Sequence, residues 1–400
     1  MRPIDATPLI TDPYGTYAEL REAGPVHRIT GPDGRPAWLV TRYEDVRQGL
    51  NDPRLSLDKR NALPGQYSGF ALPAALDANL LNMDPPDHTR VRRLVVKAFT
   101  VGRVEKLRAP VRRLADELLA AVEADGQADL LAAYAAPLPI TVICDLLGVP
   151  QDHRPDFRSW TDELLTPDRS RPHLMKEALA NMMRFLTGLI AAKRAEPADD
   201  LLSDLIAARE EDDRLSEEEL TSLAFLILFA GYENTVHLIS NAILALVDHP
   251  EVQRELRKNP DGLAAAVEEF NRWDGPAALA IRRFPLEDME IGGVTVPAGE
   301  TVWLSLASAN RDPARFPDAD RLDLGRGAAG HLALGHGIHY CVGAPLGRME
   351  AEIALAALLD RFGDLELAVP REELRWRPTI RARGLISLPV RWDSVEQTGF

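Results

Sequence analysis

Cys341 is the residue whose type and surroundings most clearly point to chemistry. Gly335, Gly337 and Gly343 bracket it, and glycine permits positive φ and close approach of the backbone to a large ligand. A helix is predicted just after the cysteine, where its N-terminal amides favour a negative charge. The only other cysteine, Cys144, lies in an apolar helical stretch and is expected to be a buried core residue. No disulfide or tetrahedral zinc site is indicated, so Cys341 is expected to act as an anionic ligand.

The segment around this cysteine, LGHGIHYCVGAPLGR, resembles the haem-binding loop of the cytochromes P-450, F-G-x-G-x-H-x-C-x-G-x-x-L-A-R. The resemblance implies haem b (iron protoporphyrin IX) with iron held by the Cys341 thiolate, and Gly335 and Gly343 among the cofactor-binding residues. Leu334 stands where the family has phenylalanine, which bears on the tuning of the iron because that ring packs near the sulfur. Gly347 replaces a frequent alanine, at a cost to the helix of about 1 kcal/mol.

A glutamate and an arginine three residues apart precede the cysteine loop. Glu269 and Arg272 share a helix face and resemble the family's E-x-x-R, 72 residues before Cys341. The resemblance implies a buried bidentate pair that joins a third residue, expected to be Arg321, and stabilises the haem-binding core without doing chemistry.

Four basic residues match positions that hold the haem propionates in the family. The sequence DPPDHTRVR resembles D-P-P-x-H-x-x-x-R and supplies His88 and Arg92, four residues apart on one helix face. Arg283, on a predicted strand after E-x-x-R, and His339, two residues before the cysteine, complete the set. Both side-chain types form charge-assisted bonds to carboxylates. Arg282 is expected to point to the opposite face of that strand.

A third motif, AGYENT, lies in a long predicted helix. It resembles the family's A/G-G-x-D/E-T-T, which crosses the distal face of the haem, and it begins at Ala230. The resemblance implies that Gly231 opens the helix groove for O₂ and that Glu233 relays protons. In register, the family's alcohol is replaced by Asn234, and Thr235 comes one residue later.

Three interpretations of this departure remain open. Asn234 has both a donor and an acceptor, so it can order a proton-delivering water, with help from a substrate hydroxyl. Alternatively, the enzyme performs a reaction other than routine hydroxylation. In the third interpretation, Thr235 serves as the alcohol because the helix is locally distorted.

The elements that position these residues are mostly helical. Ser216 and Glu219 form a capping box that opens a helix with no strong breaker until Pro250, about 30 residues and roughly 45 Å. Further helices are predicted at residues 43–50 and 347–362 and after Asp87, which is expected to cap its helix. Residues 25–30 and 36–41 predict a hairpin, residues 61–82 a long loop, and residues 281–284, 289–296, 301–306 and 385–392 strands. The expected fold class is mainly α (α+β): the cytochrome P-450 fold, a helix-rich domain with a smaller segregated β region and a long central helix across the haem.

Composition limits the class of protein. The chain has 400 residues without repeats or a linker, so a single domain over residues 1–400 is expected. Its N-terminus lacks a signal peptide, and its longest apolar run has nine residues, against about 20 needed to span a bilayer. We therefore expect a cytoplasmic protein, free of membrane and monomeric. The net charge of −15 argues against nucleic-acid binding.

The source of electrons is expected to be another protein. No flavin or dinucleotide fingerprint follows a strand, so the resemblance implies a ferredoxin and a ferredoxin reductase. Residues 90–113 hold nine basic residues and one acid. This run, together with Arg348, is either a docking patch for an acidic ferredoxin or a solvated helix face.

The resemblance implies a haem-thiolate monooxygenase that hydroxylates a medium or large natural product, such as a macrolide, steroid or peptide. Oxidative aryl or phenol cross-linking of an aromatic peptide is the main alternative. A peroxide-using enzyme is disfavoured because no arginine lies near Asn234, and a non-catalytic haem protein is the remaining alternative. Residues expected by family position to contact the substrate are Phe70, Leu81, Tyr232, His237 and Leu279.

Overall fold

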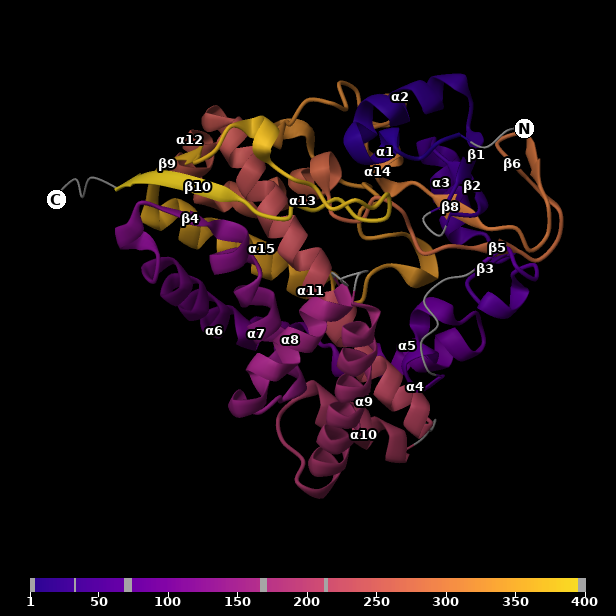
Figure 1. The fold of residues 1–400 in the computed structure, drawn as a ribbon, viewed down its shortest axis with the longest axis horizontal. Coiled ribbons are helices and arrows are strands. Elements are labelled where there is room, and N and C mark those ends of the chain that lie inside the picture. The colour runs from indigo at the N-terminus through magenta and orange to yellow at the C-terminus, as the bar shows by residue number, and fades with distance from the viewer. Residues whose placement is uncertain (1–3, 32–33, 68–73, 166–170, 212–214, 395–400) are drawn as a thin grey trace.

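Helices dominate the molecule, and its strands gather in small sheets, one group near β1 (Val26–Thr30) and β2 (Pro36–Val40) and another beside α12 (Pro250–Lys258) and α15 (Ala344–Arg361) (Figure 1). This computed structural model describes residues 4–31, 34–67, 74–165, 171–211 and 215–394. The predicted mainly α (α+β) class is confirmed. Phe70, one of the expected substrate contacts, lies outside the described residues.

The helices fall into a short N-terminal group, a long middle group and a C-terminal group. They are α1 (Pro8–Thr11), α2 (Pro13–Ala23), α3 (Tyr43–Asn51), α4 (Ala74–Asp77), α5 (Asp87–Ala98), α6 (Val101–Ala120), α7 (Pro137–Leu147), α8 (Arg154–Leu165), α9 (Pro172–Ala195), α10 (Leu201–Glu211), α11 (Glu217–Asp248), α12 (Pro250–Lys258), α13 (Leu263–Asp274), α14 (Leu306–Asn310) and α15 (Ala344–Arg361).

The strands of the described residues form two three-stranded sheets and two two-stranded sheets. One sheet has the order β1 (Val26–Thr30), β2 (Pro36–Val40), β8 (Val302–Leu304), with an antiparallel and then a parallel pairing. Another has the order β4 (Gln127–Asp129), β10 (Pro389–Ser394), β9 (Phe362–Leu367). The remaining pairs are β3 (Leu55–Ser56) with β5 (Phe284–Pro285) and β6 (Met289–Ile291) with β7 (Val294–Val296).

The predicted hairpin is confirmed as β1 and β2, whereas later strands are shorter than predicted. The predicted strand at residues 281–284 forms only at its end, as β5, with an isolated bridge between Arg283 and Val302. Asp87 does not cap α5, because it is the first residue of the helix and Pro86 precedes it. The predicted long loop contains the short helix α4.

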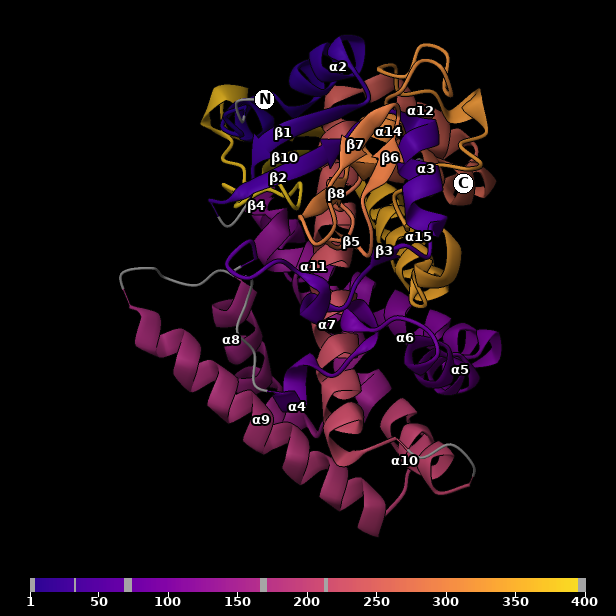
Figure 2. The same cartoon turned by 90° about the vertical axis from the view of Figure 1, so that its right-hand side faces the viewer.

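Helix α11 passes through the middle of the molecule, with α9 on one side and α6 and α15 on the other (Figure 2). The predicted capping box forms: Ser216 Oγ accepts from the Glu219 amide at 3.0 Å, and the Glu219 carboxylate accepts from the Ser216 amide at 2.8 Å. The 32 residues of α11 span about 48 Å, and Pro250 follows its end. Its length and composition would also suit a membrane span, but 61 % of its apolar window is buried inside the protein, as for a core helix.

Helix α15 joins the cysteine loop to the core. It begins at Ala344, three residues before the predicted start, and packs on α6, α11 and α13. Its Leu346, Met349 and Leu358 belong to the main hydrophobic cluster, which also includes much of α11. The cysteine loop therefore leads directly into one of the most buried helices of the molecule.

The predicted pair of Glu269 and Arg272 lies on α13 and is fully buried, with side chains 1 % and 0 % exposed. Arg272 Nε and Nη2 each donate to the Glu269 carboxylate at 2.7 Å. Arg272 Nη1 donates to the carbonyl oxygens of Asn310 and Ala319 at 2.9 and 2.8 Å. Because the guanidinium also bonds to these loop carbonyls, the pair ties α13 to the chain that leads to the cysteine loop.

The third residue of this cluster is Arg326, so the prediction of Arg321 is wrong. Arg326 Nε donates to Glu269 Oε1 at 3.3 Å, after the short helical turn Leu324–Arg326 brings it back over α13. Arg321 contributes its backbone carbonyl, which accepts from both Arg272 and Arg326 at 3.2 Å, while the residue itself is exposed.

Replacing Glu269 by alanine is expected to lower the free energy of unfolding by about 3–5 kcal/mol, because it leaves the buried Arg272 charge without its carboxylate. Arg326→Ala should cost about 1–3 kcal/mol, since it removes one hydrogen bond to a buried charge. The exposed Arg321→Ala should stay within about 0.5 kcal/mol of the parent. Urea unfolding followed by circular dichroism measures all three; equal losses for the Arg321 and Arg326 variants would contradict the assignment of Arg326.

Candidate active site

The loop before α15 is shaped by glycine. Gly335 and Gly337 have φ of 76° and 72°, a backbone conformation that side chains other than glycine rarely adopt. A side chain at Gly337 would also collide with Asn51. The loop closes on itself, because the Cys341 amide donates to the Leu334 carbonyl at 2.9 Å. Gly343 has an ordinary φ of −79°, so it is not required for a positive φ.

The Cys341 side chain is accessible to solvent, but the protein around it desolvates its thiol. Desolvation raises the pKa of its thiol above the usual value. The amide of Gly343, the cations Arg92 and Arg348, and the amide of Ala344 act in the opposite direction. The thiol alone therefore stays protonated, whereas a coordinating metal cation deprotonates it. The donor set suits a metal held on one thiolate.

The four predicted propionate residues gather beside this loop. The His88 and His339 rings lie 4.1 Å apart, and Arg92 Nη2 donates to the Tyr340 carbonyl at 2.6 Å. Arg283 Nη1 donates to the Leu55 carbonyl at 3.2 Å, and its Nε is buried without a partner. Both ring nitrogens of His88 are also buried without a partner.

The electrostatics of this cluster call for an anion. Burial, reinforced by Arg92, lowers the pKa of His88 to about 4. Burial, reinforced by His88, Arg283 and Arg92, lowers the pKa of His339 to about 3. Burial lowers the pKa of Arg283 to about 10. Among the described residues no carboxylate is hydrogen-bonded to any of the four, so the cluster fits a ligand that carries carboxylates, as haem does.

Arg282 points away from this cluster, as predicted. Its Nη1 donates to the Leu81 carbonyl at 3.2 Å, and its guanidinium lies 5.1 Å from the centre of the Tyr67 ring. Adjacent Arg282 and Arg283 therefore contact different elements.

One face of α11 is open although most of the helix is buried. Ala230 and Asn234, one turn apart, are exposed, and Asn234 Nδ2 is 3.4 Å from the Ala230 carbonyl. Thr235 is buried, its hydroxyl donates to the Gly231 carbonyl at 3.0 Å, and a Cβ at Gly347 of α15 would lie 3.6 Å from that hydroxyl. Thr235 therefore brings this stretch of α11 against α15 at a point six residues after Cys341.

Gly231 does not lie on the open face. A Cβ there would come within 2.7 Å of Ile143 on α7, so this glycine allows α7 to pack closely against α11. The exposed small residue of the open face is Ala230. The structure is regular α-helix through residues 230–235.

Glu233 is half-buried beside the open face. Its Oε1 pairs with Arg377 Nη1 at 2.8 Å and lies 4.0 Å from His237 Nε2. Burial raises the pKa of Glu233, and Arg377 and then Arg381 lower it. Arg377 comes from a loop near the C-terminus, so no spacing in the sequence indicates this partner.

Three of the four substrate-contact candidates that the structure describes are packed against, or hydrogen-bonded to, other side chains of the protein. Tyr232 is buried and donates to Asp162 of α8 at 3.0 Å, and His237 is buried against Arg377. Leu279 belongs to a hydrophobic cluster with Leu9 and Trp303. Leu81 is partly buried.

Comparison with known proteins identifies the family. The family model described as Cytochrome P450 matches residues 17–375. The chain is 48 % identical to the Cytochrome P450 monooxygenase PikC of Streptomyces venezuelae over 97 % of this chain and 93 % of that protein. It is 44 % identical to the Mycinamicin IV hydroxylase/epoxidase of Micromonospora griseorubida over 94 % and 95 % of the two chains. The solved structure of tirandamycin C-bound P450 monooxygenase TamI superposes with a TM-score of 0.88 at 45 % identity, over 98 % of this chain and 100 % of that one. The family match over most of the chain, the sequence identity to these relatives and the common fold show that the chain belongs to the cytochrome P450 family of monooxygenases.

Proposed function

We propose that this monooxygenase binds haem b through Cys341 and uses O₂ to hydroxylate a medium or large natural product. One observation carries the proposal: four basic residues, two of which (His88 and Arg283) have buried nitrogens without a hydrogen-bond partner, border the loop that presents the Cys341 thiol. His88, Arg92, Arg283 and His339 would hold the two propionates, and Cys341 would hold the iron. When bound, the haem supplies the activation of O₂.

The substrate class rests on the relatives. A similar protein is named for hydroxylation of mycinamicin IV, and another was solved with tirandamycin C. Ile227 is partly buried and lies three and seven residues before Ala230 and Asn234, so the open face of α11 includes an apolar side chain that suits a ligand with an apolar surface. Cross-linking of an aromatic peptide is the alternative function.

Electrons would come from a ferredoxin and its reductase. Much of the basic run that suggested a docking patch is neutralised: Arg90 pairs with Glu219, Arg103 with Asp204, and Arg112 with both Asp116 and Asp360. These pairs support the alternative of a solvated helix face for most of the run.

A better docking candidate is a 520 Å³ pocket bounded by the cysteine loop itself. Its lining holds Arg47, Arg315 and Arg348 with the carboxylates of Glu44 and Glu268, together with His331 and His336. Glu268 pairs with Arg348 at 2.6 Å and Glu44 pairs with Arg47 at 3.5 Å. The three arginines against two carboxylates leave a small positive excess next to the cysteine loop, which suits an acidic ferredoxin. We further propose that the chain is a single-domain monomer that works in the cytoplasm.

Labelled oxygen distinguishes the two functions. A substrate is first identified by the spectral shift that it causes on binding, from a panel of a macrolactone, a steroid and an aromatic peptide. In a reaction with haem, a ferredoxin system and ¹⁸O₂, this substrate should gain one ¹⁸O atom. Mass spectrometry of the product measures this. Loss of two hydrogens from the peptide without any ¹⁸O would contradict hydroxylation and favour cross-linking.

Asn234 is the polar side chain that we assign to the oxygen side. Thr235 points to the Gly231 carbonyl and to α15, and α11 is regular at this point, so the interpretation that relies on a distorted helix lacks support. The Asn234 amide lies on the open face, where it can hold a proton-delivering water.

Replacing Asn234 by leucine is therefore expected to lower the rate of product formation by about 10- to 100-fold, which is below the ~10²- to 10⁴-fold effect of a lost acid–base group because the amide only positions the proton-delivering water. Thr235→Val should change the rate by less than about twofold, since its hydroxyl only bonds within its own helix. Both rates are measured with the identified substrate, and the haem spectrum serves as the control for folding. A larger loss in the Thr235 variant than in the Asn234 variant would overturn the assignment.

A further inference from the structure

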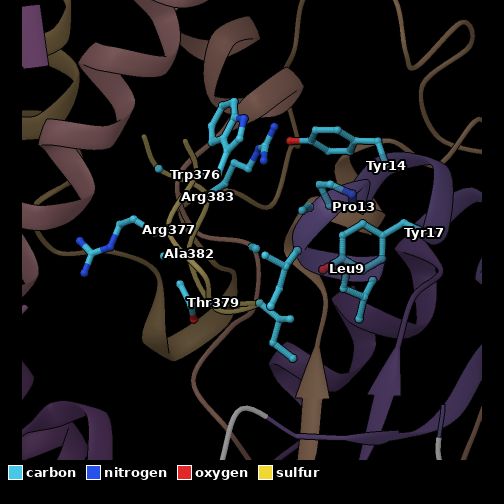
Figure 3. Close-up of a pocket in the computed structure, with 14 residues that line it drawn as sticks. Leu9, Pro13, Tyr14, Tyr17, Trp376, Arg377, Thr379, Ala382 and Arg383 are labelled. Atoms are coloured by element: carbon cyan, nitrogen blue, oxygen red, sulfur yellow. The ribbon is translucent and has the colours of Figure 1, made fainter. Parts of the chain in front are cut away.

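The loop at residues 376–384 lies between the N-terminal helices and α11. On its outer side it lines a pocket of only about 20 Å³ with Leu9, Pro13, Tyr14 and Tyr17 of α1 and α2. Arg377 extends to the other side of the loop from Tyr14 and Tyr17 (Figure 3). That pocket is too small for a ligand, whereas the Arg377 side chain reaches α11.

Arg377 contacts two residues of α11 that lie one turn apart. Its Nη1 pairs with Glu233 Oε1 at 2.8 Å and lies 3.2 Å from His237 Nε2. The side chains of Arg377 and Glu233 are 16 % and 21 % exposed, so the ion pair is shielded from bulk water. Salt bridges in such partly buried positions are screened less than those on the surface.

This geometry fixes the protonation of His237. A guanidinium only donates, so His237 Nε2 must accept and the ring hydrogen must sit on Nδ1. Nδ1 is buried and has no partner. Gly384 lies so close to the His237 ring that any side chain at that position would collide with it. The imidazole is therefore held in one orientation and one tautomer.

Resting on the proposed function, we propose that Arg377 is a positioning residue for proton delivery. It holds the Glu233 carboxylate against loop 376–384 and fixes His237 as its Nδ1–H tautomer. Protons then reach the open face of α11 from this loop. Asn234 is the neighbour of Glu233 in sequence and lies on that open face.

The proton balance is simple. The Glu233 carboxylate takes one proton from solvent as its ion pair with Arg377 opens, and passes it through a hydrogen-bonded water to the acceptor beside Asn234. The carboxylate then re-forms the ion pair, so charge and protons in the protein return to their starting values. The Arg377 pair sets how readily the carboxylate takes up its proton.

Few charges face this cluster. Arg377 and then Arg381 lower the pKa of Glu233 against the effect of burial. For His237, burial and then Arg377 lower the pKa, to about 3, so its folded-state pKa lies below the physiological range. The imidazole should therefore stay neutral from about pH 5 to 8, since it gains a proton only below that window.

The decisive experiment is ¹⁵N NMR of the histidine rings in the reduced, carbon-monoxide-bound holoprotein, which is diamagnetic. The His237 signals are assigned by their loss in His237→Asn. In the parent protein they should report the neutral Nδ1–H tautomer without titration from about pH 5 to 8. In Arg377→Ala, His237 Nε2 loses its donor and faces the Glu233 carboxylate, so the signals should change to Nε2–H.

Arg381→Ala is the matched control. This substitution removes one positive charge from the same loop, and no hydrogen bond from Arg381 to Glu233 or His237 is lost. The His237 tautomer in Arg381→Ala should therefore match that of the parent protein. An Nε2–H tautomer in the parent protein, or the same tautomer in the parent and Arg377→Ala, would overturn the proposal.

Coupling of electrons to product gives an independent measurement. Arg377→Ala should reduce the fraction of electrons recovered in product about tenfold, below the ~10²- to 10⁴-fold effect of a lost acid–base group, while substrate binding is retained. Arg377→Lys should restore most of the coupling because it keeps the charge. Unchanged coupling in Arg377→Ala would overturn the proposal. Failure of the proposed function gives a different result, because the parent protein itself would then lack a haem-thiolate spectrum or form a product without ¹⁸O.

Discussion

The fold of this protein is arranged around two neighbouring groups whose charges are not neutralised within the protein: the Cys341 thiol and the basic cluster beside its loop. A thiol in a desolvated position has a raised pKa and becomes an anion only when a cation binds to it. Beside it, His88, Arg92, Arg283 and His339 crowd together with no hydrogen-bonded carboxylate among the described residues. A metal bound in a ring that carries two carboxylates neutralises both groups together. The buried Glu269–Arg272–Arg326 cluster, by contrast, is satisfied internally, as expected for a structural element.

Different faces of helix α11 serve packing and the proposed oxygen site. Thr235 and Gly231 face α15 and α7 and serve packing, whereas Ala230 and Asn234 remain open. Glu233 lies on the opposite side of the helix from Gly231 and Thr235, next to the open face, and is held by Arg377. A regular helix thus places a small residue, an amide and a carboxylate at the same site without local distortion.

The features that could be predicted from the sequence are those set by local spacing. The capping box at Ser216, the pairing of Glu269 with Arg272 and the helix after Cys341 all depend on residues close in the chain. The third member of the buried cluster was wrongly predicted, because a short turn brings Arg326 back over α13 while Arg321 faces solvent. Arg377 was missed for a related reason: it reaches Glu233 from 144 residues away in the chain, and only the fold brings them together.

The absorption spectrum of the reduced, carbon-monoxide-bound protein tests the central claim most directly. A thiolate ligand to haem iron produces the long-wavelength band that gives the family its name. The parent protein and Cys144→Ala, which alters a buried thiol elsewhere, are predicted to show this band, and Cys341→Ser is predicted to lose it. A parent protein without the band, or a Cys341→Ser variant that keeps it, would contradict the assignment of Cys341 as the ligand on which the whole account rests.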